Sequence, residues 1–183
     1  QGICVSGSTT FSSTVSGGTW SSGNTGIATI NSSSGAISGV SAGTATITYT
    51  QAGSGGCSDN TETRTVTVTA APSAGTLSGT QGICVSGSTT FSSTVNGGTW
   101  SSSNTGIATI NSSSGAISGV SAGTATITYT QTGSGGCSDA TATKTVHVYA
   151  AAPGGVASNL LLWLKADAQA NNSGTTLATD GQR

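Results

Sequence analysis

Four cysteines are the residues of this sequence with the clearest capacity for chemistry. They are Cys4, Cys57, Cys84 and Cys137, and four cysteines allow three pairings. Because the spacing from Cys4 to Cys57 equals that from Cys84 to Cys137, we expect the pairs Cys4–Cys57 and Cys84–Cys137. In the chain-entropy model, closing a loop of this length with a disulfide would stabilise the fold by about 4 kcal/mol. Zinc is the alternative, but the close-spaced C-x-x-C pairs typical of zinc sites are missing from the sequence. Disulfides predict an extracellular or cell-surface location.

Other reactive residue types have simpler interpretations. Ser41 and Ser121 lie in G-x-S-x-G sequences, but a nucleophile elbow requires a strand-to-helix turn with a histidine and an acid nearby. Both serines instead precede an alternating strand pattern, so we predict tight turns. His147 has Thr67 as its counterpart in an internal repeat described below, which favours a surface position. Asp59 and Asp139 are too few for calcium and are predicted to cap turns. No catalytic, cofactor-binding or metal-binding residue is predicted, and the chain is not expected to be an enzyme.

Composition excludes further classes of function. Charged residues make up 5% of the chain and the net charge is −1, whereas nucleic-acid binding depends on clustered Lys and Arg. No stretch approaches the roughly 20 apolar residues of a membrane-spanning helix. The chain begins at Gln1 and ends at Arg183 within a pattern, so we expect a segment of a longer protein.

An internal repeat of eighty residues organises the chain. Residues 1–70 recur at 81–150, and only eight of the seventy aligned positions differ. We therefore predict one domain over 1–70 and a second over 71–150, followed by a linker and the start of a third domain over 151–183. The segment 73–80 is predicted to begin the first strand of the second domain. The first domain then lacks an equivalent strand and should be the less complete of the two.

Alternating patterns predict strands in both repeats. Ala125, Ile127 and Tyr129 alternate with threonines, which gives one apolar face with a period of two. Short strands separated by Gly- and Ser-rich turns indicate an all-β sandwich, and neither repeat has a helical period. The expected core consists of matched aromatic and aliphatic residues from the two copies: Phe11, Trp20, Ile47, Tyr49, Phe91, Trp100, Ile127 and Tyr129.

The run GTWSSSNTGIATINSSSGAISGVSAGTATITYT at 98–130, with its twin at 18–50, resembles the group 2 bacterial immunoglobulin-like domain. The resemblance implies tandem Ig-like Greek-key β-sandwiches, each expected here to contain one intradomain disulfide. It also implies a place in an adhesin or another large surface protein. The cysteines and the sequence PSAGTLSGT resemble the subset found in long surface proteins of gliding bacteria, many of which are exported by type IX secretion. The family has no catalytic residues.

Residues 154–183 depart from the repeat. LLLWLKAD at 160–167 resembles the opening of a lectin-like domain of the laminin-G or concanavalin A type. A linker with one apolar strand is the simpler interpretation, and Trp163 is then a core residue rather than a sugar-stacking platform.

Three functions fit the sequence. The leading hypothesis is a non-catalytic structural or adhesive stalk, in which the partners are neighbouring domains of the same chain. One alternative is a spacer for a C-terminal module that binds surface glycans. The other is the protomer of an extracellular filament, in which threonine-rich strand edges pair with other copies of the chain.

Overall fold

The computed structural model describes residues 1–150, and every regular element in this range is a β-strand. Within these residues there is no helix that could span a membrane. The expected lectin-like segment and Trp163 lie outside the described residues. In the first repeat the strands are β1 (Gly2–Cys4), β2 (Ser8–Thr10), β3 (Thr19–Ser22), β4 (Ala28–Ile30), β5 (Ala36–Gly39), β6 (Gly43–Gln51) and β7 (Asn60–Thr69).

Two sheets form each sandwich. In the first repeat one sheet has the strand order β1-β7-β6-β3 and the other has the order β2-β5-β4. The first and last strands of the repeat are parallel neighbours, with Gly2 opposite Thr67 and Cys4 opposite Thr69. The remaining pairs are antiparallel. This arrangement, with three strands facing four and non-adjacent strands paired, is the Greek-key order of the immunoglobulin fold.

The second repeat reproduces this topology and adds two short strands. Its strands are β8 (Leu77–Ser78), β9 (Gly82–Cys84), β10 (Ser88–Thr90), β11 (Ser92–Ser93), β12 (Thr99–Ser102), β13 (Ala108–Ile110), β14 (Ala116–Gly119), β15 (Gly123–Gln131) and β16 (Ala140–Tyr149). The sheets have the orders β12-β15-β16-β9 and β10-β14-β13, and β8 pairs with β11. The strand expected within 73–80 is therefore β8.

Each repeat has its own hydrophobic core, because the apolar faces of its two sheets meet. Ile47 and Ile127, at matched positions on strands β6 and β15, are both 0% exposed. Phe11, Phe91, Trp100 and Tyr129 are also buried, whereas Trp20 and Tyr49 are only partly buried. The two cores share no residue.

The segment before β9 explains why the aromatic residues of the second repeat are better covered. Ala74 is buried and Leu77 packs against the second core, while Ser93 Oγ donates a 2.7 Å hydrogen bond to the Ala74 carbonyl. The first repeat has no counterpart of β8 within residues 1–150. Its Trp20 and Tyr49 are correspondingly more exposed than Trp100 and Tyr129.

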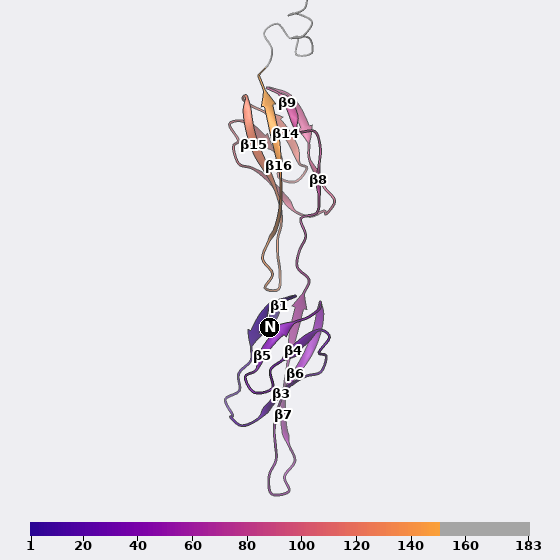
Figure 1. The fold of residues 1–183 in the computed structure, drawn as a ribbon, viewed down its shortest axis with the longest axis vertical. Coiled ribbons are helices and arrows are strands. Elements are labelled where there is room, and N and C mark those ends of the chain that lie inside the picture. The colour runs from indigo at the N-terminus through magenta and orange to yellow at the C-terminus, as the bar shows by residue number, and fades with distance from the viewer. Residues whose placement is uncertain (151–183) are drawn as a thin grey trace, which may run out of the picture.

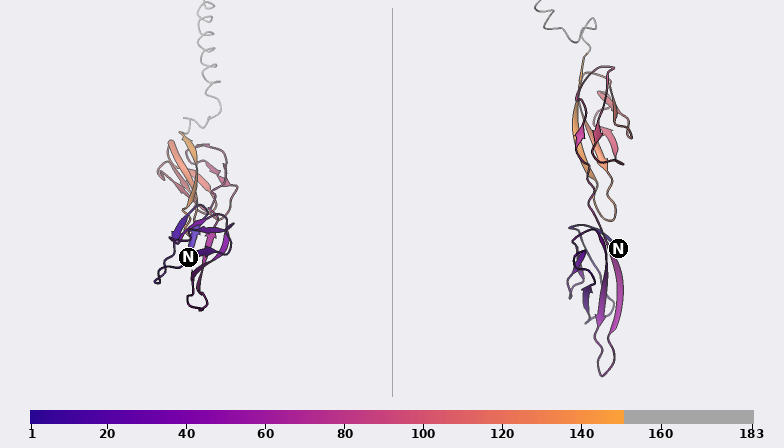
Figure 2. Two further views of the ribbon diagram at one scale, coloured as in Figure 1. Left: turned by 60° about the horizontal axis from the view of Figure 1, so that its bottom comes forward. Right: turned by 90° about the vertical axis from the view of Figure 1, so that its right-hand side faces the viewer.

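The two sandwiches lie end to end along the long axis of the molecule (Figures 1 and 2). The chain leaves the first at the end of β7, and Ala74 already belongs to the core of the second. The loop between β15 and β16 extends from the second sandwich toward the end of the first that carries β1 (Figure 1). The corresponding loop between β6 and β7 lies at the opposite end of the first sandwich.

Candidate functional site

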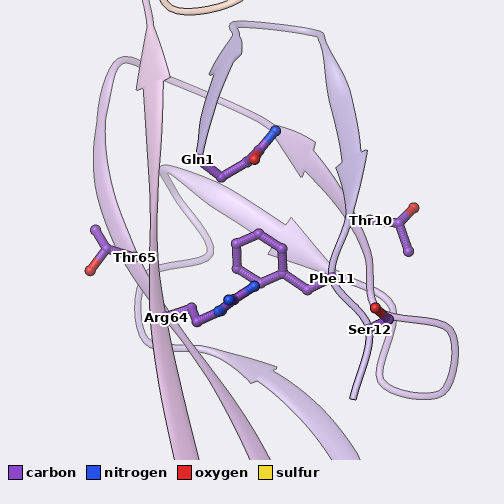
Figure 3. Close-up of a pocket in the computed structure, with 6 residues that line it drawn as sticks. All are labelled: Gln1, Thr10, Phe11, Ser12, Arg64 and Thr65. Atoms are coloured by element: carbon purple, nitrogen blue, oxygen red, sulfur yellow. The ribbon is translucent and has the colours of Figure 1, made fainter. Parts of the chain in front are cut away.

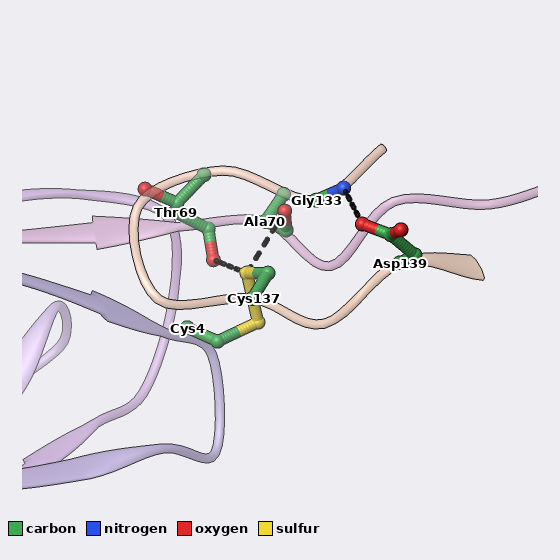
Figure 4. Close-up of a disulfide and its surroundings, with 6 residues drawn as sticks. All are labelled: Cys4, Thr69, Ala70, Gly133, Cys137 and Asp139. Atoms are coloured by element: carbon green, nitrogen blue, oxygen red, sulfur yellow. Dashed lines mark hydrogen bonds between the residues drawn. A yellow bond between two sulfur atoms is a disulfide. The ribbon is translucent and has the colours of Figure 1, made fainter. Parts of the chain in front are cut away.

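A disulfide between the two repeats is the most distinctive feature of the molecule. Cys4 on β1 is bonded to Cys137 in the β15–β16 loop, with a Cα–Cα separation of 4.7 Å (Figure 4). Cys57 and Cys84 are free thiols, the former exposed and the latter partly exposed. The expected pairs Cys4–Cys57 and Cys84–Cys137 are therefore wrong, and neither sandwich contains an intradomain disulfide.

The length of the last strand is the physical reason for this correction. Cys4 lies opposite Thr69, where β7 ends, whereas Cys57 precedes Asn60, where β7 begins. A strand of ten residues spans about 33 Å, and a disulfide requires Cα atoms within about 7 Å. The two cysteines of one repeat therefore lie at opposite ends of their sandwich. Only the loop of the following repeat brings a cysteine to Cys4.

The loop that carries Cys137 fits closely against the first sandwich. Gly135 and Gly136 have φ angles of 61° and 90°, a conformation that glycine adopts without steric cost. A Cβ added at Gly135 would collide with Thr69 Oγ1, and one at Gly136 would lie 3.3 Å from the Gly2 oxygen. The two glycines thus provide both the turn and the close approach of the backbones.

Polar contacts complete this loop. The carboxylate of Asp139 accepts a 2.9 Å hydrogen bond from the Gly133 N–H (Figure 4), and Asp59 makes the equivalent bond with Gly53. The predicted turn-capping role of both aspartates is confirmed. Cys137 Sγ lies 3.5 Å from the carbonyl oxygens of Thr69 and Ala70. Because a disulfide sulfur has no hydrogen to donate, these are packing contacts. They join the Cys137 loop to the end of β7 and the start of the linker.

Substituting alanine for Gly135 should weaken the packing of the Cys137 loop against the first sandwich. The added Cβ meets Thr69, and overpacking of this kind costs about 1–3 kcal/mol, which is roughly a fivefold to 150-fold loss in equilibrium population. We expect G135A to lower the fraction of chains that re-form Cys4–Cys137 in a glutathione redox buffer, measured by mass spectrometry of alkylated thiols.

The matched control for this experiment is G55A. Gly55 has nearly the same φ angle, 62°, but no atom lies within 4 Å of an added Cβ. G55A therefore carries the same backbone strain without the contact, and it should leave formation of Cys4–Cys137 unchanged. Equal losses in the two variants would show that strain in the loop, rather than contact with Thr69, controls the bond.

The other candidate residues have structural surroundings. Ser41 Oγ donates to the Gly26 carbonyl at 2.6 Å, and Ser121 makes the same bond with Gly106, so each hydroxyl joins its segment to a loop fifteen residues earlier. His147 Nδ1 lies 3.2 Å from Thr124 Oγ1 on the exposed surface of β16. Among residues 1–150 no three His, Cys, Asp or Glu side chains gather into a group that could hold a metal ion.

An open pocket lies beside Phe11 on the first sandwich (Figure 3). It has a volume of about 420 Å³, and its lining includes Gln1, Phe11 and Arg64. The guanidinium carbon of Arg64 lies 5.8 Å from the centre of the Phe11 ring, a cation–π distance. In the second repeat Gly79 approaches the equivalent ring so closely that an added Cβ would lie 2.7 Å from Phe91 Cδ1. The pocket thus corresponds to the place that the β8 segment fills in the second repeat.

The fold and the joint define the class of protein: tandem immunoglobulin-like β-sandwiches connected end to end by a short linker and a disulfide. No family model matches the sequence, and no curated protein matches it.

Solved structures give loose matches to this chain. They include a C-terminal fragment of intimin in complex with the intimin-binding domain of its receptor (17% identity, TM-score 0.39, 72% of this chain and 51% of that chain). A second is a SusE-like, surface-located polysaccharide-binding protein of Bacteroides thetaiotaomicron (16%, 0.30, 75% and 30%). A third is Drosophila N-cadherin EC1–4 (8%, 0.36, 78% and 44%). The chain spans about half or less of each protein, and such low scores assign it no function.

Proposed function

We propose that residues 1–150 are spacer domains in the stalk of a secreted or cell-surface protein. The observation that carries this proposal is the double covalent connection between the sandwiches. One connection is the linker after Thr69, and the other is the Cys4–Cys137 bond. Two connections at one junction restrict the angle between the domains far more than a linker alone, and a restricted angle is what a spacer requires.

The surroundings of the candidate residues support a role without catalysis. The hydroxyls of Ser41 and Ser121 and the carboxylates of Asp59 and Asp139 are engaged in hydrogen bonds to backbone groups of their own repeat. Among residues 1–150 the exposed positions are largely threonine, serine and glycine, and the whole chain has a net charge of −1. Such a surface suits a chain that holds other domains at a distance.

The location and partners follow from the same proposal. A structural disulfide persists in oxidising compartments, and the Cys4–Cys137 bond therefore supports a proposed location outside the cytoplasm. The sequence resemblance adds the finer proposal of a bacterial adhesin-type protein exported by type IX secretion. The partners proposed for these repeats are the neighbouring domains of their own chain, and surface glycans would be bound by other modules.

Solution scattering from the full chain tests the proposed spacer. Two sandwiches held end to end should give a distance distribution with a second maximum at their centre-to-centre spacing. The largest dimension should exceed about 60 Å, the length of two ten-residue strands in line. A single compact maximum, which would arise from sandwiches folded side by side, would contradict the proposal.

A further inference from the structure

Cys57 and Cys84 occupy the same positions in their repeats as the two cysteines that are bonded. The eighty-residue period relates Cys57 to Cys137 and Cys84 to Cys4. The first sandwich therefore carries a free copy of the loop cysteine at one end, and the second carries a free copy of the strand cysteine. The molecule thus contains one inter-repeat disulfide, Cys4–Cys137, which we call the closed joint. It also contains an unbonded copy of each of the two cysteines that form such a joint.

The loop around Cys57 already has the shape of the docked loop. Gly55 and Gly56 have φ angles of 62° and 88°, within a few degrees of those in the closed joint. The Cys57 N–H donates to the Ser54 carbonyl at 3.2 Å, and the equivalent bond in the docked loop is 3.0 Å. Among residues 1–150 no atom lies within 4 Å of a Cβ added at either glycine. The free loop is therefore formed before it docks and has no neighbour against it.

In the closed joint the Cys137 loop packs against the strand around Cys4, which we call the receiving surface. The strand around Cys84 has the same backbone arrangement. Cys84 lies opposite Tyr149 in a parallel pair, as Cys4 lies opposite Thr69. Val85 N–H donates to the Tyr149 carbonyl at 2.9 Å, the same length as the bond from Val5 to Thr69. The backbone that accepts the loop in the first repeat is therefore present in the second.

One of the substitutions on the receiving surface lies where the loop would dock. Tyr149 replaces Thr69, and its Cε2 lies 3.2 Å from a Cβ added at Gly82. In the closed joint the equivalent position at Gly2 faces Gly135 at 3.3 Å. The tyrosine ring therefore occupies the space that an incoming loop would take. Because Tyr149 is 60% exposed, the ring can rotate into solvent.

We propose that Cys57 and Cys84 are the two halves of a second disulfide joint, and that each binds another copy of this chain head to tail. Cys57 in the loop of one copy bonds to Cys84 on the strand of the next, in the register of the Cys4–Cys137 joint. Two thiols lose two protons and two electrons as the sulfur–sulfur bond forms. A low-molecular-weight disulfide accepts them, so that one oxidised glutathione yields two reduced glutathione molecules. In the filament hypothesis, copies of the chain would then be linked by disulfides rather than by the pairing of strand edges.

The test uses the full chain with Cys4–Cys137 formed, incubated at high concentration with oxidised and reduced glutathione. We expect a ladder of dimers and higher oligomers on a non-reducing gel. Chymotryptic peptides separate all four cysteines, because Phe, Trp, Tyr or Leu lies between each consecutive pair. Mass spectrometry should identify Cys57–Cys84 as the new bond. Symmetric Cys57–Cys57 or Cys84–Cys84 bonds in equal amounts would overturn the proposal, since they require no docking.

Three variants sharpen this test. C57S alone and C84S alone should each remain monomeric, while a mixture of the two should stop at a dimer, because each chain then has one half of the joint. Y149T restores the threonine of the closed joint and should speed dimer formation several-fold. Failure of Y149T to form Cys57–Cys84 dimers, with its Cys4–Cys137 bond intact, would also overturn the proposal.

Discussion

The oxidised chain, pulled by its two ends, should extend about 450 Å less than the reduced chain. The disulfide joins residues 133 positions apart, and each residue of an unravelled chain contributes about 3.3–3.6 Å. Tension that enters at Gln1 reaches Cys4, crosses to Cys137 and leaves along β16. The residues between the two cysteines therefore bear no tension while the bond is intact. β16 is already an extended strand, so its residues add little further length.

Single-molecule force spectroscopy of the full chain, with handles at Gln1 and Arg183, measures this difference. C137S should behave like the reduced wild-type chain and release the whole length. C57S is the matched control, because it removes the equivalent cysteine of the other repeat and leaves Cys4–Cys137 in place. Equal extension of the oxidised wild-type chain and C137S would show that the bond does not carry the force.

Replacing Ile127 with alanine should destabilise the second sandwich selectively. Ile127 is 0% exposed on β15, and truncation of a buried isoleucine costs about 2–5 kcal/mol. A domain of about eighty residues has only roughly 4–12 kcal/mol of stability, so the loss removes a large part of it. At about 4–8 °C per kcal/mol, one unfolding transition should fall by 10 °C or more in calorimetry.

The matched variant I47A identifies which transition belongs to which repeat. Ile47 is equally buried in the first core, and the cores have no residue in common. I47A should lower the other transition and leave the one affected by I127A in place. A single transition lowered by both variants would indicate that the sandwiches unfold as one unit.

The alternation of residue types predicted the sheets well, because period-two burial is a local property of the chain. Ala125, Ile127 and Tyr129 lie on one face of β15 with the threonines between them on the other, as expected. The segment 73–80 also contributes the strand β8. The repeat marks matched positions directly, and so it indicated where the second copy would reproduce the first.

The cysteine pairing could not be obtained from the same information. Equal spacing within the repeats is compatible with bonds inside a repeat, and it is equally compatible with bonds from each repeat to the next. The decision depends on the parallel pairing of β1 with β7, which places Cys4 at the far end of a ten-residue strand from Cys57. A signal was present in the sequence, since Cys57 immediately precedes the last strand pattern of its repeat. Its meaning depends on the strand order, which the residue pattern does not contain.

If the chain is exported N-terminus first, as a secreted protein would be, the 133-residue separation of Cys4 and Cys137 sets the order in which they leave the membrane. The first sandwich has all its strands outside long before its partner cysteine emerges. The first sandwich can therefore fold while Cys4 is still a thiol, and the Cys4–Cys137 bond forms only after the second repeat has followed. Once the first sandwich has folded, Cys4 and Cys57 are held at opposite ends, which keeps Cys4 from bonding to the cysteine nearest to it in sequence.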